Sequence, residues 1–191
     1  MTWQEFLVES VTSHNEVRAL ASSSQGLAEL ITDLASLDTA DAVIELGPGT
    51  GVFTEKIVEK TRAGSTFLAF EINPKFVEVT RRRCPRCTVV QKSAVHARKY
   101  LNESGLEHCD SVVSGLPWAT FSETLQDDLL DAISDALRPG GTFVAFTYVS
   151  SLLLPGGRGF RRKLHQRFTE VEQSRVVWRN MPPAFVYRAV R

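Results

Sequence analysis

Short apolar runs alternate along the chain with segments in which apolar residues recur every three or four positions. The runs are typical of buried strands and fall at residues 43–46, 66–70, 88–90, 111–113 and 142–148. The segments between them that are most typical of amphipathic helices begin near Val52, Asn73 and Ser122. This alternation predicts a parallel sheet with helices on both faces.

Several helix ends are marked in the sequence. Asn73-Pro74 predicts an N-cap followed by proline at the first helical position, in a helix that runs to Arg83. Thr120 and Glu123 have capping-box spacing, as do Ser22 and Gln25 upstream. The helix from 122 to 137 is expected to end before residues 138–141 and to bury one face, made of Leu125, Leu129, Ile133 and Leu137.

The pattern changes after Tyr148. Two further strands are predicted at 171–178 and 184–190, joined in a hairpin-like ending through 180–183. Residues 1–191 are long enough for one domain with a sizeable core, and we expect residues 1–37 to form a helical lead-in that covers a ligand site.

A glycine-rich turn follows the first predicted strand, in the segment Glu45-Leu46-Gly47-Pro48-Gly49-Thr50-Gly51. Glycines here permit positive φ and close approach of a ligand, and the next helix offers unpaired N–H groups. The dinucleotide pattern G-x-G-x-x-G is not met because Val52 replaces its third glycine, and no Gly-Lys-Ser/Thr completes a phosphate loop. Glu71 ends the next strand twenty residues after Gly51, where nucleotide-binding folds place a carboxylate on ribose hydroxyls.

Composition excludes some classes of function. No apolar run approaches the roughly 20 residues of a membrane span, and no signal peptide is visible, so we expect a cytoplasmic protein. The balance of 22 basic and 22 acidic residues argues against a nucleic-acid partner. Three cysteines, two of them in the lone motif Cys84-Pro85-Arg86-Cys87, favour a reducing compartment and neither a metal nor a redox site.

The glycine turn resembles the E/D-x-G-x-G-x-G motif of class I S-adenosylmethionine-dependent methyltransferases, and the likeness extends from about Leu27 to the end of the chain. It implies a seven-stranded, mostly parallel, Rossmann-like sheet with a C-terminal antiparallel hairpin strand. It further implies that S-adenosylmethionine is held by Glu45, Gly47, Gly49, Thr50, Gly51, Glu71, Ile72, Ser93, Ala94, Ser114 and Leu116.

Three segments narrow the resemblance to bacterial phospholipid N-methyltransferases, which convert phosphatidylethanolamine toward phosphatidylcholine. They are 110–117, 146–148 and 177–184. The likeness implies a phospholipid substrate, and we expect an aromatic pocket for its amine made by Trp118 and Tyr148. The Tyr148 hydroxyl is the candidate catalytic group, and Arg179 is the candidate partner of the lipid phosphate.

The chain departs from related patterns at three points. Adenine N-methyltransferases begin their N-x-P-Y/F motif with Asn or Asp, but Gly115 occupies that position. Residues 92–94 read Lys-Ser-Ala, where phospholipid methyltransferases usually have Gly-Asp-Ala. Their N-terminal helix tends to be basic, whereas Glu5, Glu9 and Glu16 precede the first basic residue here.

Membrane contact is expected from two segments. Trp3, Phe6, Leu7 and Val11 form an apolar stripe suited to an interface, or one that simply covers the cofactor site. Between 151 and 169 there are five basic residues and no acid, which favours an anionic membrane surface on the inner face, or a solvated helix face. Methylation of RNA adenine or of a small molecule, and cofactor binding without catalysis, remain alternatives. The sequence does not predict an oligomeric state.

Overall fold

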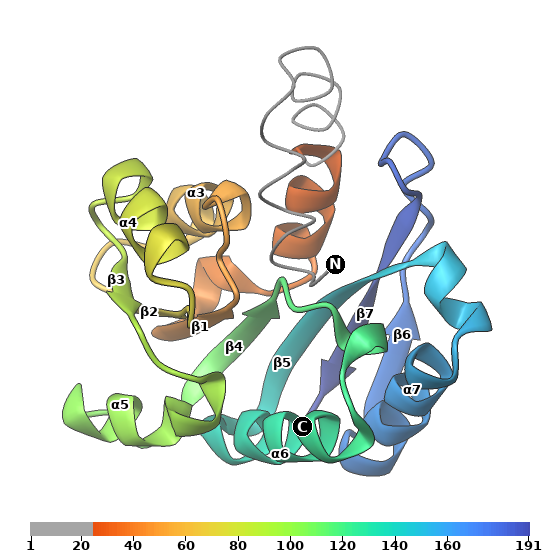
Figure 1. Ribbon diagram of the computed structural model, residues 1–191. Helices are drawn as coiled ribbons and strands as arrows, with labels where there is room; N and C mark the ends of the chain where they lie inside the picture. The colour runs from red at the N-terminus through yellow and green to blue at the C-terminus, as the bar shows by residue number, and fades with distance from the viewer. Residues whose placement is uncertain (1–24) are drawn as a thin grey trace.

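The computed structural model describes residues 25–191 and contains one seven-stranded sheet with helices on both faces (Figure 1). The strand order is β3-β2-β1-β4-β5-β7-β6; the first five strands are parallel, and β7 is antiparallel to β5 and β6. The strands span Ala42–Leu46 (β1), Thr66–Phe70 (β2), Thr88–Val90 (β3), Cys109–Ser114 (β4), Leu137–Tyr148 (β5), Glu170–Gln173 (β6) and Ala184–Val190 (β7). The predicted fold class is confirmed.

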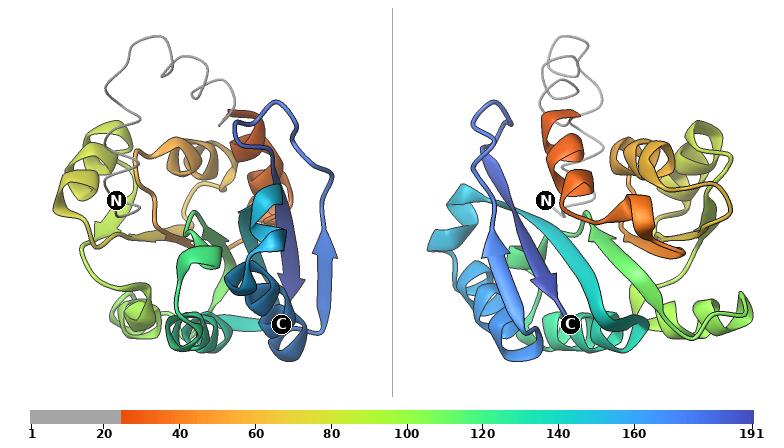
Figure 2. Two further views of the ribbon diagram at one scale, coloured as in Figure 1. Left: turned by 45° about the vertical axis from the view of Figure 1, so that its right-hand side comes forward. Right: turned by 180° about the vertical axis from the view of Figure 1, so that it is seen from behind.

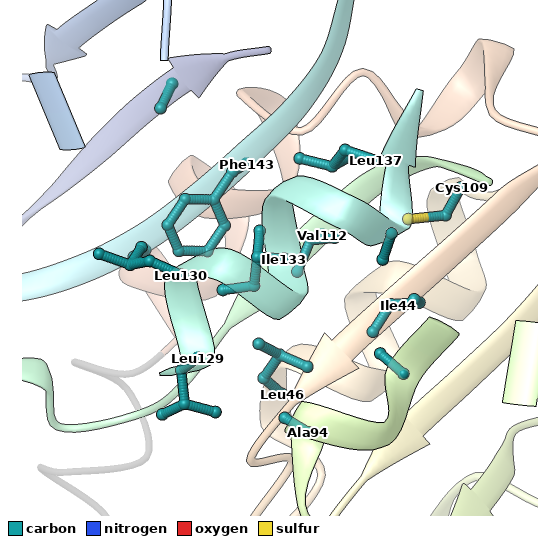
Figure 3. Close-up of a cluster of buried hydrophobic side chains, with 14 of the residues drawn as sticks. Ile44, Leu46, Ala94, Cys109, Val112, Leu129, Leu130, Ile133, Leu137 and Phe143 are labelled. Atoms are coloured by element: carbon teal, nitrogen blue, oxygen red, sulfur yellow. The ribbon is translucent and has the colours of Figure 1, made fainter. Parts of the chain in front are cut away.

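The helices in the first part of the chain cover one face of the sheet, and the later helices cover the other. A helix at residues 25–33, α3 (Val52–Lys60) and α4 (Pro74–Arg83) pack on one face. The other face is covered by α5 (Ala97–Glu103), α6 (Glu123–Ala136) and α7 (Pro155–Arg167) (Figure 2). Because β1 is buried on both sides, Val43 contributes to one core and Ile44 to the other. Figure 3 shows the core under α6, where Ile44, Leu46 and Val112 of the strands meet the apolar face of the helix.

Two helix starts test the predicted caps. The Asn73 side chain accepts a hydrogen bond from the Lys75 N–H at 2.9 Å, as predicted for the N-cap of α4. The cap predicted for α6 was wrong, since Ser122 accepts from the Leu125 N–H and Thr120 instead ends the 3-10 helix η3 (Trp118–Thr120). The Ser22 cap and the apolar stripe of Trp3 lie outside the described residues.

Leu125 was wrongly assigned to the buried face of α6, for it lies in the first turn and is 38% exposed. β5 begins at Leu137 instead of 142, because Leu137 pairs with Cys109 and Gly140 N–H donates to the Arg191 carbonyl. β6 ends at Gln173, five residues before its predicted end, and beyond it only Val177 bridges Ala184. In the described part of the chain, no helix is both long enough and apolar enough to cross a bilayer.

The basic segment that was expected to face a membrane forms most of α7, and two of its cations are structural. Lys163 is buried and donates to the Glu123 carbonyl and to Asp127 at 2.8 Å. Arg167 pairs with Asp127 and Asp131. A buried ammonium must be paired to be tolerated, and the acids of α6 satisfy both side chains. Only the remaining arginines of this segment, Arg158, Arg161 and Arg162, are exposed.

Candidate active site

The exits of three parallel strands meet at the carboxyl edge of the sheet. The glycine turn after β1 is joined to β2 by a hydrogen bond from Gly47 N–H to the Phe70 carbonyl, at 2.9 Å. The exit of β4 is joined to β1 by a bond from Gly115 N–H to the Leu46 carbonyl, at 2.8 Å. Ligands of parallel α/β sheets bind at this edge, so the predicted cofactor residues are gathered where a ligand would lie.

Glu71 connects the end of β2 to the glycine turn. Its side chain is buried, and one carboxylate oxygen accepts from Asn73 N–H at 2.9 Å while the other accepts from Gly49 N–H at 3.3 Å. These bonds fix the carboxylate beside the turn before any ligand arrives. A carboxylate with spare acceptor capacity there is suited to paired hydroxyls such as those of a ribose.

Gly49 has the conformation and the space that ligand approach requires. Its φ is +56°, a region that favours glycine, and an added Cβ would meet no protein atom within 4 Å. The turn is supported from α4, because Thr80 donates its hydroxyl to the Gly49 carbonyl at 3.0 Å and Arg83 donates to the Thr50 carbonyl at 3.0 Å. Neither support could be predicted from the sequence, because neither residue belongs to the motif and each lies more than 30 residues from its partner.

Glu45 lies beneath the turn. It is fully buried in β1; one oxygen accepts from the Thr54 hydroxyl at 2.7 Å, and the other has no hydrogen-bond partner. Burial, with a smaller contribution from the charge of Glu71, raises the pKa of Glu45 to about 8, although the bond from Thr54 opposes the shift. The side chain is therefore placed to support the turn from inside the protein.

Glu45 should make the stability of the protein depend on pH. Its ordinary pKa is 4.5, so between 4.5 and about 8 the folded protein retains a proton that the unfolded chain releases. The stability that this retained proton contributes is fully present below pH 4.5, and it is lost progressively as the pH rises from 4.5 through about 8. In this window the free energy of unfolding should fall with rising pH by up to about 1.4 kcal/mol per pH unit, and we expect Glu45→Gln to remove this slope. Urea unfolding of both proteins between pH 5.5 and 8.5 measures this, and parallel stability curves would refute the protonated state.

The remaining predicted cofactor residues surround the same edge. Ile72 is exposed directly after Glu71, and Ser93 caps the turn after β3, with Ala94 buried behind it. Ser114 ends β4, and its hydroxyl accepts from the N–H of Leu116 at 3.3 Å. The Leu116 side chain lies against Gly47. Cofactor contacts at these residues stay predictions.

Trp118 lies in the core, not at the surface of the site. It is 2% exposed, its ring stacks on Phe160 of α7 with centroids 4.5 Å apart, and its indole N–H donates to the Ser114 hydroxyl at 3.0 Å. The Gln126 side-chain amide bridges the carbonyls of Trp118 and Gly156, which ties the β4 exit to the start of α7. The structure therefore shows Trp118 positioning the strand exit, and its substrate contact stays a prediction.

Tyr148 and Arg179 come from different parts of the C-terminal half. Tyr148 ends β5 and packs edge-to-face on Phe146, which packs in the same way on Phe53 of α3. Burial raises the pKa of the Tyr148 phenol, so it remains protonated at neutral pH. Arg179 is exposed in the loop that precedes β7, which begins opposite Tyr148 in the sheet register. Their proposed roles remain untested.

The three cysteines are all buried as free thiols. Burial raises the pKa of Cys84 to about 11, which leaves it protonated and unreactive at neutral pH. Within residues 25–191, no group of His, Cys, Asp and Glu is arranged to hold a metal ion.

A sheet of this order, with a glycine turn after β1 and a carboxylate after β2, defines a class I S-adenosylmethionine-dependent methyltransferase. The open face of Gly49 and the fixed carboxylate of Glu71 fit the amino-acid and ribose parts of that cofactor. Residues 43–141 match the family model described as a methyltransferase domain, and the chain belongs to this family. S-Adenosylmethionine is its cofactor, as predicted.

Known proteins with similar sequences and structures are also methyltransferases. An ornithine lipid N-methyltransferase of Singulisphaera acidiphila is 30% identical over 174 residues, which are 90% of this chain and 86% of that protein. A dimethyladenosine transferase of Chaetomium thermophilum is 26% identical over 97 residues, which cover 51% of this chain and 24% of that protein. The N-methyltransferase NodS of Bradyrhizobium japonicum, solved with S-adenosyl-L-homocysteine, has a TM-score of 0.72 at 15% identity and covers 98% of this chain and 97% of its own. At that identity the structural likeness shows the fold alone.

Proposed function

We propose that this N-methyltransferase acts on the primary amine of a membrane lipid headgroup. The observation that carries the proposal is the extent of the likeness to the ornithine lipid enzyme, which reaches 90% of the chain. The family model ends at residue 141, so the alignment must extend into residues outside the shared methyltransferase domain. Function on a shared fold depends on the particular site, so a likeness that extends beyond the shared domain supports a similar acceptor better than the domain match alone.

The exit of β4 supports an acceptor other than adenine. An added Cβ on Gly115 would lie 2.6 Å from the Gly47 carbonyl oxygen, closer than real Cβ contacts allow. An Asn or Asp at this position would therefore displace the glycine turn. The amide anchor of adenine methyltransferases is absent, and the backbone here leaves no room to restore it.

Methyl transfer requires the protein to align an amine with the methyl donor and to keep that amine unprotonated. Bound S-adenosylmethionine would supply its sulfonium methyl group: a C–N bond to the amine would form as the C–S bond breaks, with S-adenosylhomocysteine as the leaving group and a proton released from the nitrogen. An alkylamine with a pKa near 10.4 is a free base in only about one molecule in 2,500 at pH 7, and apolar surroundings raise that fraction. The aromatic pair of Phe146 and Tyr148 offers such surroundings. Because its phenol stays protonated, Tyr148 is better suited to orient the amine by a hydrogen bond than to act as a phenolate base.

Two lipids with a primary amine in the headgroup are candidate acceptors. Phosphatidylethanolamine is favoured by the segments shared with phospholipid methyltransferases, and an ornithine lipid is favoured by the similar enzyme. Both headgroups carry a primary amine near an anionic group, which is a phosphate in one and a carboxylate in the other. The exposed guanidinium of Arg179 is a suitable partner for either anion.

Label transfer tests the class of acceptor. We expect methyl-labelled S-adenosylmethionine to label a lipid extract at least 100-fold more than ribosomal RNA or soluble amines at equal amine concentration. This follows from the missing adenine anchor at Gly115 and the lipid-enzyme likeness. Label recovered only in methyladenine, or only in a soluble amine, would contradict the lipid proposal. A protein that binds the cofactor but labels none of the three would be a non-catalytic binder.

A further inference from the structure

Large apolar side chains are exposed together at one corner of the molecule. Leu153 of the 3-10 helix η4 (Val149–Leu153) is 80% exposed, and Leu154 follows it. In the loop at residues 174–183, between β6 and β7, Trp178 is 72% and Met181 67% exposed. A hydrogen bond from Val149 N–H to the Pro183 carbonyl, at 2.9 Å, holds the two segments side by side. Both segments therefore lie at the same end of β5 and β7, and both carry exposed apolar side chains.

The loop that carries Trp178 and Met181 is internally hydrogen-bonded. Val177 N–H donates to the Ala184 carbonyl at 2.7 Å, and Asn180 N–H donates to the Val177 carbonyl at 3.1 Å. The buried Asn180 side chain donates to the Pro182 carbonyl. Figure 2 shows the loop projecting beyond the ends of β6 and β7. These hydrogen bonds hold the loop while its largest apolar side chains stay exposed, and burying that apolar area in a contact would be favourable.

The two segments of this corner, residues 149–160 and 174–183, contain three arginines and no acid. The last 43 residues contain nine Lys and Arg but two acids, whereas the first 148 contain 13 and 20. Those two acids, Glu170 and Glu172, lie in β6 and outside the projecting loop, and Glu172 pairs with Arg188. Arg175 lies in the loop itself, and Arg158 follows Leu154 by one helical turn. Exposed apolar side chains in segments that also carry arginine are complementary to an anionic bilayer.

We propose that this corner, the C-terminal rim, docks the enzyme on anionic membranes. The rim consists of Leu153, Leu154, Arg158, Arg175, Trp178 and Met181. Trp178 and Met181 enter the headgroup region, a depth that tryptophan prefers, and the arginines contact lipid phosphates. The proposal rests on the proposed function, and it identifies the surface through which that enzyme reaches its substrate.

The rim is connected to the site by short stretches of chain. η4 follows Tyr148 directly, and α7 begins two residues after Leu153. The Gln126 bridge and the Trp118–Phe160 stack join the first half of α7 to the exit of β4. A membrane at the rim therefore lies next to the strand ends that hold the candidate acceptor residues.

Tryptophan fluorescence tests which surface enters the bilayer. The chain has three tryptophans, so Trp3→Phe leaves the buried Trp118 and the exposed Trp178. With vesicles of phosphatidylglycerol and brominated phosphatidylcholine, we expect the Trp3→Phe protein to show a blue shift and quenching. A second substitution, Trp178→Phe, should abolish both. Undiminished quenching in the double variant, or sedimentation with vesicles without any quenching of Trp178, would overturn the proposal.

Vesicle sedimentation measures the contribution of charge. Removing Arg158 and Arg175 together should weaken binding by up to about 30-fold at low salt and less at 1 M salt, where the Debye length falls to about 3 Å. The matched control removes two other exposed arginines, Arg82→Ala at the end of α4 and Arg86→Ala just after it, and should bind like the parent. Equal losses in both variants, or self-association through the rim in place of vesicle binding, would refute membrane docking.

A detergent assay separates failure of this proposal from failure of the proposed function. The variant Leu153→Ser with Met181→Ser should bind S-adenosylmethionine normally and methylate lipid dispersed in mixed micelles, but lose at least 10-fold of its rate on vesicles. Equal rates on vesicles would exclude the rim while leaving the lipid function intact. If neither protein methylates micellar lipid but the rim still binds vesicles, the proposed function fails and the docking surface stands.

Discussion

Replacing Trp118 with Ala should lower the free energy of unfolding by about 3–5 kcal/mol. The indole is 2% exposed, stacks on Phe160 and donates to the Ser114 hydroxyl, so its removal leaves a cavity and takes away one of the two hydrogen bonds that this hydroxyl accepts. This loss is a large part of the roughly 5–15 kcal/mol that stabilises a typical domain. Urea denaturation with a two-state fit measures it.

Trp178 provides the matched control, because it is the same residue type at 72% exposure. Trp178→Ala should change the stability by no more than about 0.5 kcal/mol. Trp118→Phe should lie between the two, since it keeps an aromatic ring on Phe160 but loses the bond to Ser114. If Trp118→Ala were as mild as Trp178→Ala but abolished lipid methylation, Trp118 would belong to a substrate pocket and not to the core.

Replacing Glu71 with Ala should weaken S-adenosylmethionine binding by about 10- to 150-fold. Hydrogen bonds to a charged group contribute about 1.5–3 kcal/mol, and the carboxylate also fixes the Gly49 N–H of the turn. Calorimetric titration with S-adenosylmethionine measures the change directly. Glu78→Ala is the control, because Glu78 lies exposed on α4 and contacts only Arg82 among the described ion pairs.

Gly49→Ala complements that variant. The new Cβ would meet no protein atom, so the folding cost comes from the positive φ and should be about 1–2 kcal/mol. Cofactor affinity should fall in addition, because the Cβ enters the face on which the ligand is expected to lie. Unchanged affinity in both the Gly49 and Glu71 variants would show that the cofactor binds elsewhere.

Much of the fold could be predicted because its signals are local. The buried strands at 66–70 and 88–90 have the bounds of their apolar runs, and the Asn73-Pro74 cap lies where its chemistry indicates. The glycine turn and Glu71 were recognisable because their spacing is set by one strand, one turn and one helix. The positive φ of Gly49 and its bond to Glu71 agree with that prediction.

The predictions that were wrong concern residues whose structure depends on contacts with distant parts of the chain. Ser122 caps α6 because the chain between 118 and 120 turns as a 3-10 helix, which removes Thr120 from the capping position. Lys163 and Arg167 were expected to face a membrane, since nothing local reveals that Asp127 of α6 lies beside them. The sequence also does not distinguish a buried aromatic residue such as Trp118 from an exposed one such as Trp178, because burial depends on contacts that are distant in the sequence.

The most direct measurement combines the purified protein, S-adenosylmethionine with an isotope-labelled methyl group, and vesicles of defined lipid. One set of vesicles contains phosphatidylethanolamine, another an ornithine lipid, and a third only lipids without a primary amine. Fragmentation mass spectrometry should locate the label on the headgroup nitrogen in the first or second set and detect none in the third. Active protein that binds the cofactor yet leaves both amine lipids unlabelled would contradict lipid N-methylation.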